Sequence, residues 1–138
     1  MPVDLPQNYR PSSSEVYMNP LQLEYFRRKL ERMREDLVRQ ARNTSMSSIA
    51  DSRPEGDQAD QASAETEHDM AALNQARART LLTAVEQALA RIANGDYGFC
   101  EDTGDPIGLK RLEAEPTATL SVEAKERRER AAGRPPSG

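Results

Sequence analysis

The feature that most constrains this chain is a spacing of alternately three and four residues between apolar side chains over residues 23–37. The positions are Leu23, Phe26, Leu30, Met33 and Leu37. Such a spacing draws one apolar stripe along a helix, and it is typical of the a and d positions of a coiled coil. The preceding Asn19-Pro20 predicts the helix start, with Asn as N-cap and Pro at the first helical position. A long helix is therefore expected from residue 20.

A second stretch repeats this spacing. Its positions are Ala78, Leu81, Val85, Ala88 and Ile92, flanked by Leu82 and Leu89. Asn94-Gly95 predicts its C-terminal cap. Between the two stretches, residues 51–60 combine Pro54 and Gly56 with acidic side chains, as a turn in water does. Two such helices joined by one turn predict an antiparallel hairpin, with arms of roughly 30 residues that reach about 45 Å.

The seam of the first arm becomes polar toward the turn. In the same register the next positions are Gln40, Thr44 and Ser47. Polar side chains at a and d positions bury little apolar surface, so we expect the packing to weaken toward residue 50.

The sequence as a whole predicts four regions. We expect a flexible N-terminal arm over 1–18, the coiled-coil hairpin over 19–94 with its tip near 51–62, a small irregular knob over 95–122, and a C-terminal helix and tail over 123–138. With two Phe, four Tyr and no Trp, the apolar content comes from aliphatic residues and Ala, which suits helix interfaces. The predicted fold class is all-α.

Charge and cysteine content exclude several classes of protein. The net charge of −4 and the pI of about 5.1 lack the basic footprint of a duplex-DNA binder, so no direct sequence-specific DNA binding is expected. The single Cys100 rules out an internal disulfide. No signal peptide or membrane span is recognisable, and the cytoplasm is the expected compartment.

Acidic residues near the turn are the first candidate for chemistry. Glu55, Asp57 and Asp60 could ligate Mg²⁺ or transfer protons, but capping of a helix N-terminus is the favoured interpretation of Asp57 and Asp60. His68 has no nucleophile pattern around it and reads as an exposed helix residue. No phosphate-binding glycine loop is present. We therefore predict that the chain is not an enzyme and has no catalytic residues.

A basic run near the C-terminus is the second candidate. Its members are Lys125, Arg127, Arg128, Arg130 and Arg134. Several cationic donors can converge on phosphates. Glutamates alternate with them, however, so a salt-bridged helix face in solvent is the favoured interpretation.

The segment from Gly95 to Ala118 strongly resembles the C-terminal ribbon of the DksA/TraR family of bacterial transcription factors. Its pattern GDYGxC followed by IGxxRLEAxPTA is specific to that family. Tyr17-Met-Asn with the first seam resembles the family's first arm, and Asp57-Gln-Ala-Asp-Gln-Ala62 fits its DxxDxA tip. The resemblance covers roughly residues 16–130.

This resemblance implies a regulator of transcription initiation that binds RNA polymerase through its secondary channel and places an acidic tip near the active site. It implies Asp57, Asp60 and Ala62 as tip residues, with Asp60 the one that acts on polymerase, and Arg77 as a polymerase-binding residue. Guanosine tetraphosphate, the nucleotide of the stringent response at ribosomal RNA promoters, is an implied partner. A monomer is expected.

Two departures from the family pattern concern ligands. The zinc positions of the family fall here on Cys100, Thr103, Ser121 and Ala124, which cannot supply four soft ligands, so we predict a zinc-independent protein without a metal cofactor. Arg111 and Lys125 match basic positions of the nucleotide site. Ala84 and Glu115 stand where basic side chains are usual, and an acid repels a polyphosphate.

Two alternatives remain open. The carboxylates of the tip could help hold Mg²⁺ in polymerase and promote transcript cleavage. The hairpin could instead be an adaptor that binds a helical protein unrelated to polymerase.

Overall fold

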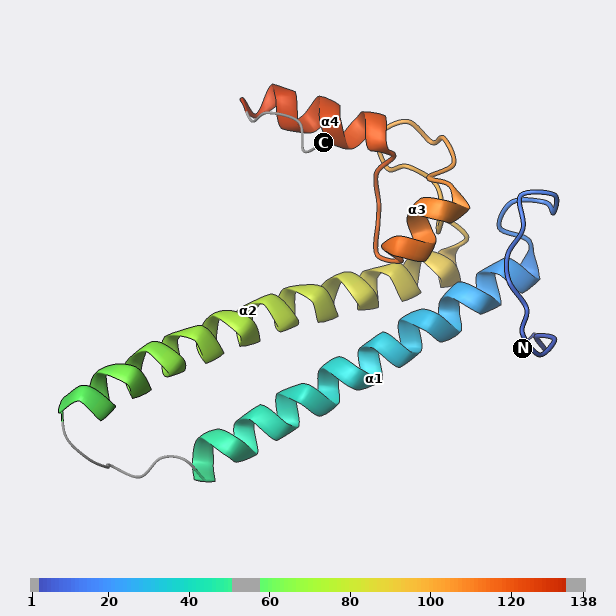
Figure 1. Ribbon diagram of the computed structural model, residues 1–138. Helices are drawn as coiled ribbons and strands as arrows, with labels where there is room; N and C mark the ends of the chain where they lie inside the picture. Colours follow the sequence, from blue (N-terminus) through green and yellow to red (C-terminus); the bar gives the residue numbers. More distant parts are fainter. Residues whose placement is uncertain (1–2, 51–57, 134–138) are drawn as a thin grey trace. The chain divides into compact units, whose positions relative to one another are not determined.

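The computed structural model describes residues 3–50 and 58–133 of the chain (Figure 1). Its four helices are α1 (Pro20–Ala50), α2 (Gln58–Asn94), α3 (Leu109–Ala114) and α4 (Val122–Ala131). In the described part no strand forms, and one isolated antiparallel bridge joins Phe99 to Pro106. This confirms the predicted all-α class with its helical hairpin. None of the described helices is long and apolar enough to cross a membrane.

The predicted helix ends are confirmed at both arms. Asn19 caps α1 through its Oδ1, which accepts a hydrogen bond from the Gln22 N–H at 2.8 Å. Helix α2 ends at Asn94, and Gly95 follows with φ +84, the left-handed conformation that glycine adopts without steric cost. These ends are encoded locally, which is why the sequence alone could locate them.

Contacts divide the chain into two compact units, which are described separately. The hairpin unit is Arg32–Glu86, and the base unit combines Met1–Glu31 with Gln87–Gly138. The predicted boundaries at residues 18, 94 and 122 stay a prediction.

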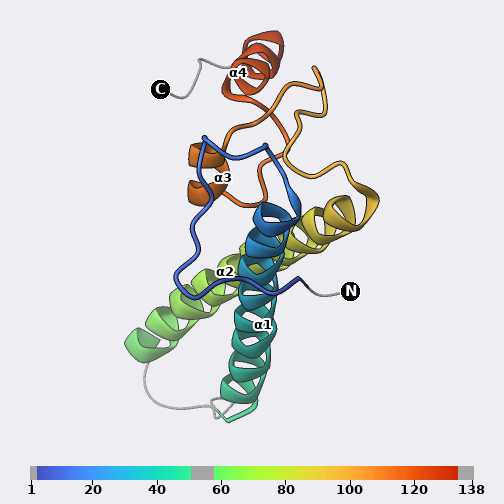
Figure 2. The ribbon, with the colours of Figure 1, turned by 90° about the vertical axis from the view of Figure 1, so that its right-hand side faces the viewer.

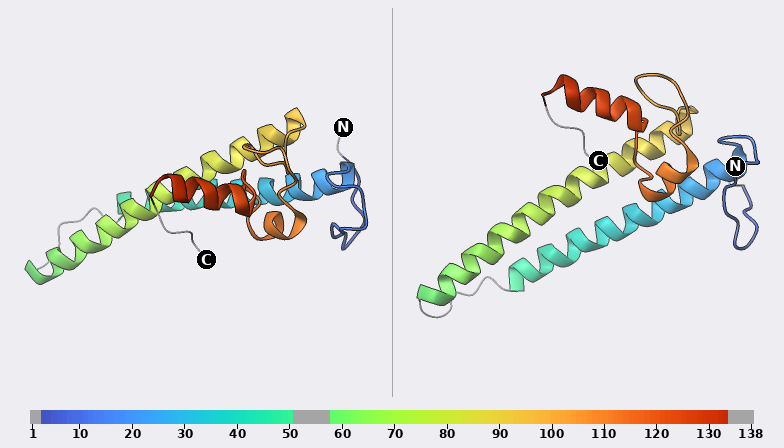
Figure 3. Two further views of the ribbon diagram at one scale, coloured as in Figure 1. Left: turned by 90° about the horizontal axis from the view of Figure 1, so that it is seen from above. Right: turned by 45° about the horizontal axis from the view of Figure 1, so that its top comes forward.

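In the hairpin unit, α1 and α2 run side by side in opposite directions (Figure 3). Among the side chains described in this unit, the buried apolar ones are Leu37 and Val85, and Arg34 lies 3.9 Å from Glu86 across the two arms. Leu81 departs from the predicted seam because its side chain is 38% exposed, whereas its neighbour Leu82 lines the space between the arms. A straight helix has 3.6 residues per turn, so a strict three-four pattern drifts around it and one seam position moved.

The base unit holds the aromatic core. Phe26, Leu30, Tyr97 and Leu112 are fully or almost fully buried. The rings of Phe26 and Tyr97 lie 5.7 Å apart, and the Tyr97 hydroxyl donates to the carbonyl of Pro116 at 2.8 Å. A buried tyrosine needs such a partner for its hydroxyl. The core thus ties α1 to the segment that follows α2.

The N-terminal segment 3–18 lies against the first turns of α1 (Figure 2). Arg28 donates to the carbonyl of Val3 at 3.0 Å, and the ring of Tyr9 packs edge-on against Tyr25. The buried amide of Gln22 accepts from the Met18 N–H at 2.8 Å and donates to the Ser12 carbonyl. These contacts give the segment a defined path along the helix.

Two elements differ from the prediction in extent. The segment 95–122, predicted to be irregular, contains the short helix α3, because the run from Leu109 to Ala114 consists of good helix formers. Helix α2 begins at Gln58, within the stretch predicted as a turn. Helix α4 begins with Ser121 as its N-cap, whose Oγ accepts from the Ala124 N–H at 3.2 Å.

Candidate functional site

The side chains of the three predicted tip residues, Asp57, Asp60 and Ala62, all lie outside the described part of the structure. Asp57 lies outside the described residues. Asp60 and Ala62 belong to the backbone of α2, whose side chains are described from residue 63 onward. Farther along this helix, Glu65, Glu67, His68 and Asp69 are all exposed to solvent, as the sequence predicted for His68. The roles proposed for the tip therefore rest on the sequence pattern.

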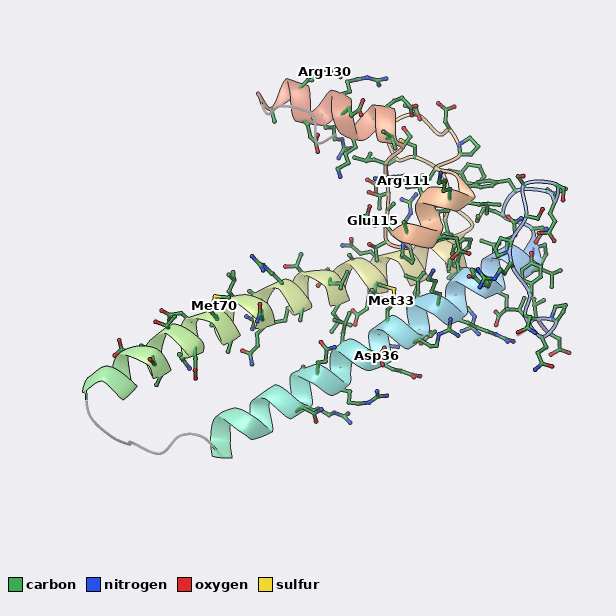
Figure 4. The ribbon with its side chains drawn as sticks, in the orientation of Figure 1. Met33, Asp36, Met70, Arg111, Glu115 and Arg130 are labelled. Atoms are coloured by element: carbon green, nitrogen blue, oxygen red, sulfur yellow. The ribbon has the colours of Figure 1, made fainter. Side chains whose placement is uncertain are left out.

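Arg77 lies on an exposed face of α2 that is unusually apolar. Met70, Leu73 and Leu81 are 53%, 44% and 38% exposed, and all three recur with Arg77 at intervals of three or four residues. Such intervals place side chains on one face of a helix. We call Met70, Leu73, Arg77, Leu81 and the half-buried Ala84 the α2 patch. Figure 4 shows Met70 on the side of α2 that faces away from α1.

The α2 patch also contains a hollow. An open cavity of about 380 Å³ is lined by Ala76, Arg77, Thr80, Leu81 and Ala84. Small side chains create this space, because Ala76, Thr80 and Ala84 leave room between Arg77 and Leu81. The Thr80 hydroxyl donates to the Ala76 carbonyl at 3.0 Å, so its methyl group remains for contact. Exposed apolar groups beside one cation are typical of a protein-binding surface.

Sequence reasoning proposed Arg77 only through the family pattern, assigned Leu81 to the seam, and missed Met70 and Leu73. Met70 and Leu73 lie outside the three-four seam of the second arm. Their apolar character at positions away from the seam was the signal by which the sequence could have revealed them. An apolar residue away from the seam of a long helix either fills a core elsewhere or awaits a partner.

Arg111, one of the two predicted nucleotide-binding residues, is held by groups of its own unit. Its Nε donates to the Leu120 carbonyl at 3.0 Å, and its terminal nitrogen lies 3.7 Å from a Glu115 carboxylate oxygen. Arg111 and Glu115 are labelled in Figure 4. Lys125, the second candidate, is exposed on α4. The guanidinium thus fixes the end of α3 to the chain that precedes α4.

A second ion pair of the base unit was not predicted. Lys29 donates to the Glu113 carboxylate at 2.9 Å and to the Glu113 carbonyl at 2.8 Å, and Tyr25 donates to the same carboxylate at 3.0 Å. Burial raises the pKa of Glu113, but the hydrogen bonds from Lys29 and Tyr25 outweigh burial and lower it. These residues dock α3 on α1, and the Lys29 ammonium is engaged by Glu113.

Glu24 is the most strongly paired carboxylate of α1. It is buried, and it accepts two hydrogen bonds from Arg27, both at 2.8 Å, and one from Arg28 at 2.7 Å. The guanidinium of Arg27, followed by that of Arg28, lowers the pKa of Glu24 to about 2 against the opposing effect of burial. The site is structural, because all its partners come from the same helix.

The positions that match the family's zinc ligands meet at the start of α4. Cys100 is buried beside the hydroxyl and N–H groups of Thr103 and Ser121. Burial raises the pKa of the Cys100 thiol, but hydrogen bonds from Thr103 and Ser121 lower it to about 6. Ala124, the fourth position, is fully buried and contributes only a methyl group. Next to this cluster, Arg128 of α4 pairs with Asp102 through two hydrogen bonds.

Comparison with known proteins identifies two matching family models. Residues 22–92 match the model described as DnaK suppressor protein DksA, N-terminal domain. Residues 95–130 match the model described as prokaryotic dksA/traR C4-type zinc finger. Together they cover most of the chain.

Individual relatives agree with these models. The chain is 48% identical over 123 residues to the RNA polymerase-binding transcription factor DksA of Caulobacter vibrioides, covering 89% of this chain and 87% of the relative. It is 36% identical over 117 residues to the protein of the same name from Escherichia coli K12, covering 85% and 78%. The structure of transcription factor DksA2 from Pseudomonas aeruginosa superposes with a TM-score of 0.77 at 40% identity, covering 90% of this chain and 94% of that one.

One prediction is corrected by these matches. We expected a zinc-independent protein without a metal cofactor, and the match of residues 95–130 to a C4-type zinc finger contradicts that expectation. The prediction weighed only the four ligand positions, whereas the match extends over the turns and core of the whole segment.

The side chains present nevertheless differ from a C4 ligand set. They provide the thiol of Cys100, the hydroxyls of Thr103 and Ser121, and the methyl group of Ala124, which do not fit four soft ligands around tetrahedral zinc. Within residues 3–50 and 58–133, no three His, Cys, Asp or Glu side chains group as metal ligands do. The family name and the donor set of this chain disagree at this point.

Proposed function

This chain belongs to the DksA family, whose relatives in Caulobacter and Escherichia are RNA polymerase-binding transcription factors, and on that basis we propose that it binds bacterial RNA polymerase and regulates transcription initiation. It acts by insertion of the hairpin into the secondary channel, where the tip comes close to the active site. It works in the cytoplasm with its polymerase, and it contributes no catalytic group of its own.

The observation that carries this proposal is the α2 patch around Arg77. A solvated helix does not normally keep Met70, Leu73 and Leu81 exposed in one line. Three apolar side chains at helical spacing suit a groove or a helix of a large protein partner, and Arg77 adds a charge that fixes orientation. We assign the patch to the contact with polymerase.

Asp57, Asp60 and Ala62 form the acting end of the hairpin in this proposal. Their DxxDxA spacing matches the tip pattern of the family, and carboxylates near a catalytic metal site act through charge even without ligating the metal. Asp60 is the residue assigned to the effect on polymerase. Asp57 and Ala62 support the tip contacts.

In this proposal guanosine tetraphosphate meets Arg111 and Lys125 of this chain. Arg111 is already engaged by Leu120 and Glu115, and a polyphosphate has to compete with the Glu115 carboxylate for it. Ala84 adds no charge. A titration of the nucleotide against polymerase with and without this protein tests its role. An unchanged nucleotide affinity removes it from the proposal.

The experiment that tests the main proposal is transcription from a ribosomal RNA promoter by purified bacterial polymerase. Wild type is compared with Asp60→Asn at equal occupancy of polymerase. Altered output with wild type and loss of that effect with the variant support regulation by the tip. Equal effects of the two proteins assign Asp60 to helix capping. A halted complex with labelled RNA adds one control, since shortened transcripts indicate the cleavage alternative.

A further inference from the structure

The two arms of the hairpin unit do not stay closed along their length. A cavity of about 410 Å³ lies between them, bounded by side chains of α1 and α2. Its walls consist of three alanines, three amides, two leucines and one arginine. These are Ala41, Ala71, Ala78, Gln40, Asn74, Gln75, Leu37, Leu82 and Arg79. A space of this size between two helices far exceeds the void that a packed protein interior leaves.

Burial of side chains ends where this cavity begins. Val85 is fully buried, and Leu37, which forms one edge of the cavity, is nearly so. We call residues 32–37 and 83–86 the closed part of the hairpin unit. Beyond them, none of the side chains described over 38–43 and 63–77 is buried. We call these two stretches the distal arms. The side chains of the distal arms therefore stay accessible to solvent, whereas those of Leu37 and Val85 are buried.

The chemistry of the cavity explains why the arms do not close over it. A coiled-coil seam is held by large apolar knobs that fill holes on the facing helix. Alanine is too short to fill such a hole, and an amide keeps its hydrogen bonds best when water is present. Leu37 and Leu82 share its walls with the amides, and the cavity is large enough to hold water molecules that satisfy these amides. Little buried apolar surface becomes exposed to water when the distal arms separate further.

Regions with few buried apolar contacts open at low free energy. We propose that the hairpin has a hinge at this cavity. The distal arms move relative to each other there, while the part of the hairpin that contains Leu37 and Val85 stays packed. The role of the hinge in transcription rests on the proposed function. There, the hinge lets the tip adjust to the polymerase interior without disturbing the α2 patch.

The hinge is tested first without polymerase, on the full-length protein. Spin labels are attached through unnatural amino acids, which leave Cys100 untouched. One pair replaces Asn43 and Asp69 on the distal arms, and a second pair replaces Glu35 and Thr83 in the closed part. The expected result is a broad distance distribution for the distal pair and a narrow one for the closed pair. A distal distribution as narrow as the closed one overturns the hinge.

A filled cavity supplies the second arm of the test. Ala71→Leu/Ala78→Leu adds apolar volume inside the cavity and keeps helix propensity high. The matched control is Ala72→Leu, because Ala72 is exposed on the same helix and lines neither cavity. The filled variant should narrow the distal distribution and raise the melting temperature, with unchanged helicity, while the control leaves the distribution broad. Equal breadth in the filled variant and the control overturns the assignment of the hinge to the cavity.

Transcription assays then separate the hinge from the proposed function. At equal occupancy of polymerase, the filled variant should lose regulatory effect that the control retains. If the filled variant has a narrowed distance distribution for the distal pair and still regulates transcription fully, the hinge has no role in regulation. A wild-type protein without effect on transcription overturns the proposed function instead, and the distance measurements still decide on the hinge.

Discussion

Tyr17 and Gly98 are 81 positions apart in the chain, and the Tyr17 hydroxyl donates a hydrogen bond to the Gly98 carbonyl at 2.7 Å. The same hydroxyl accepts a hydrogen bond from the Gly108 N–H at 3.0 Å. One phenol therefore satisfies two backbone groups of the segment that follows α2. The half-buried ring packs edge-on against Phe99, which anchors the approach to α1 in the base unit.

Replacement of Tyr17 by phenylalanine should destabilise the protein by about 1–3 kcal/mol, because it leaves the Gly98 carbonyl and the Gly108 N–H without their partner. Urea denaturation of both proteins measures the change in the free energy of unfolding. Tyr9→Phe is the control, since the Tyr9 hydroxyl donates to the nearby side chain of Glu15, and this variant should lose less stability. Equal losses from the two variants would contradict the bridging role of Tyr17.

Gly98 should tolerate alanine poorly for two reasons that can be separated. Its φ is +92, a conformation that costs a side chain about 1–2 kcal/mol. A Cβ would also lie 2.8 Å from Cγ and Sδ of Met18. Gly104→Ala carries only the first penalty, because nothing lies within 4 Å of its Cβ. We expect Gly98→Ala to be the more destabilising variant in thermal denaturation.

The clash itself predicts coupling between residues 18 and 98. In a double-mutant cycle, Met18→Ala combined with Gly98→Ala should lose less stability than the two single losses added together. Strict additivity would show that Met18 moves aside without cost.

Acid stability should depend on Glu24, whose pKa of about 2 lies below that of an ordinary carboxyl group. As the pH falls, the unfolded chain protonates this group first, so folding loses stability. The contribution is therefore complete above the ordinary carboxyl pKa and disappears as the pH falls toward 2. Glu24→Gln should lower stability at neutral pH and flatten the loss in acid.

The Glu24 prediction is checked by the free energy of unfolding between neutral pH and pH 2. Glu35→Gln, which removes an exposed carboxylate from the same helix, is the control for charge alone. An acid limb equally steep in wild type and Glu24→Gln would refute the role of the pairing.

Arg77→Ala should weaken binding to RNA polymerase while the free energy of unfolding stays unchanged, because the side chain is exposed on the α2 patch. Removal of a rim charge mainly slows association and reduces its salt dependence. A competition binding assay at two salt concentrations measures both effects. Arg42→Ala removes an exposed cation from α1 and should bind as wild type does. Equal affinity of both variants would exclude Arg77 from the contact.

The sequence by itself determined the helices and several of their ends. The three-four spacing of apolar residues, Asn19 before Pro20 and Gly95 after Asn94 act through backbone geometry and hydrogen bonds within a few residues, so they are legible without knowledge of the fold. The DxxDxA tip and Arg77 were assigned from the sequence as well, through a family pattern, and their roles stay a prediction.

Tertiary structure alone decided which side chains meet across the chain. The choice between Leu81 and Leu82 for the inter-arm face depends on helix drift against a partner. The engagement of Arg111 by Leu120 and Glu115, and the bridge from Tyr17 to Gly98, depend on segments that folding brings together. Local periodicity carries no information about such pairs, because their distance is set by packing of the whole unit rather than by the spacing of residues along a helix.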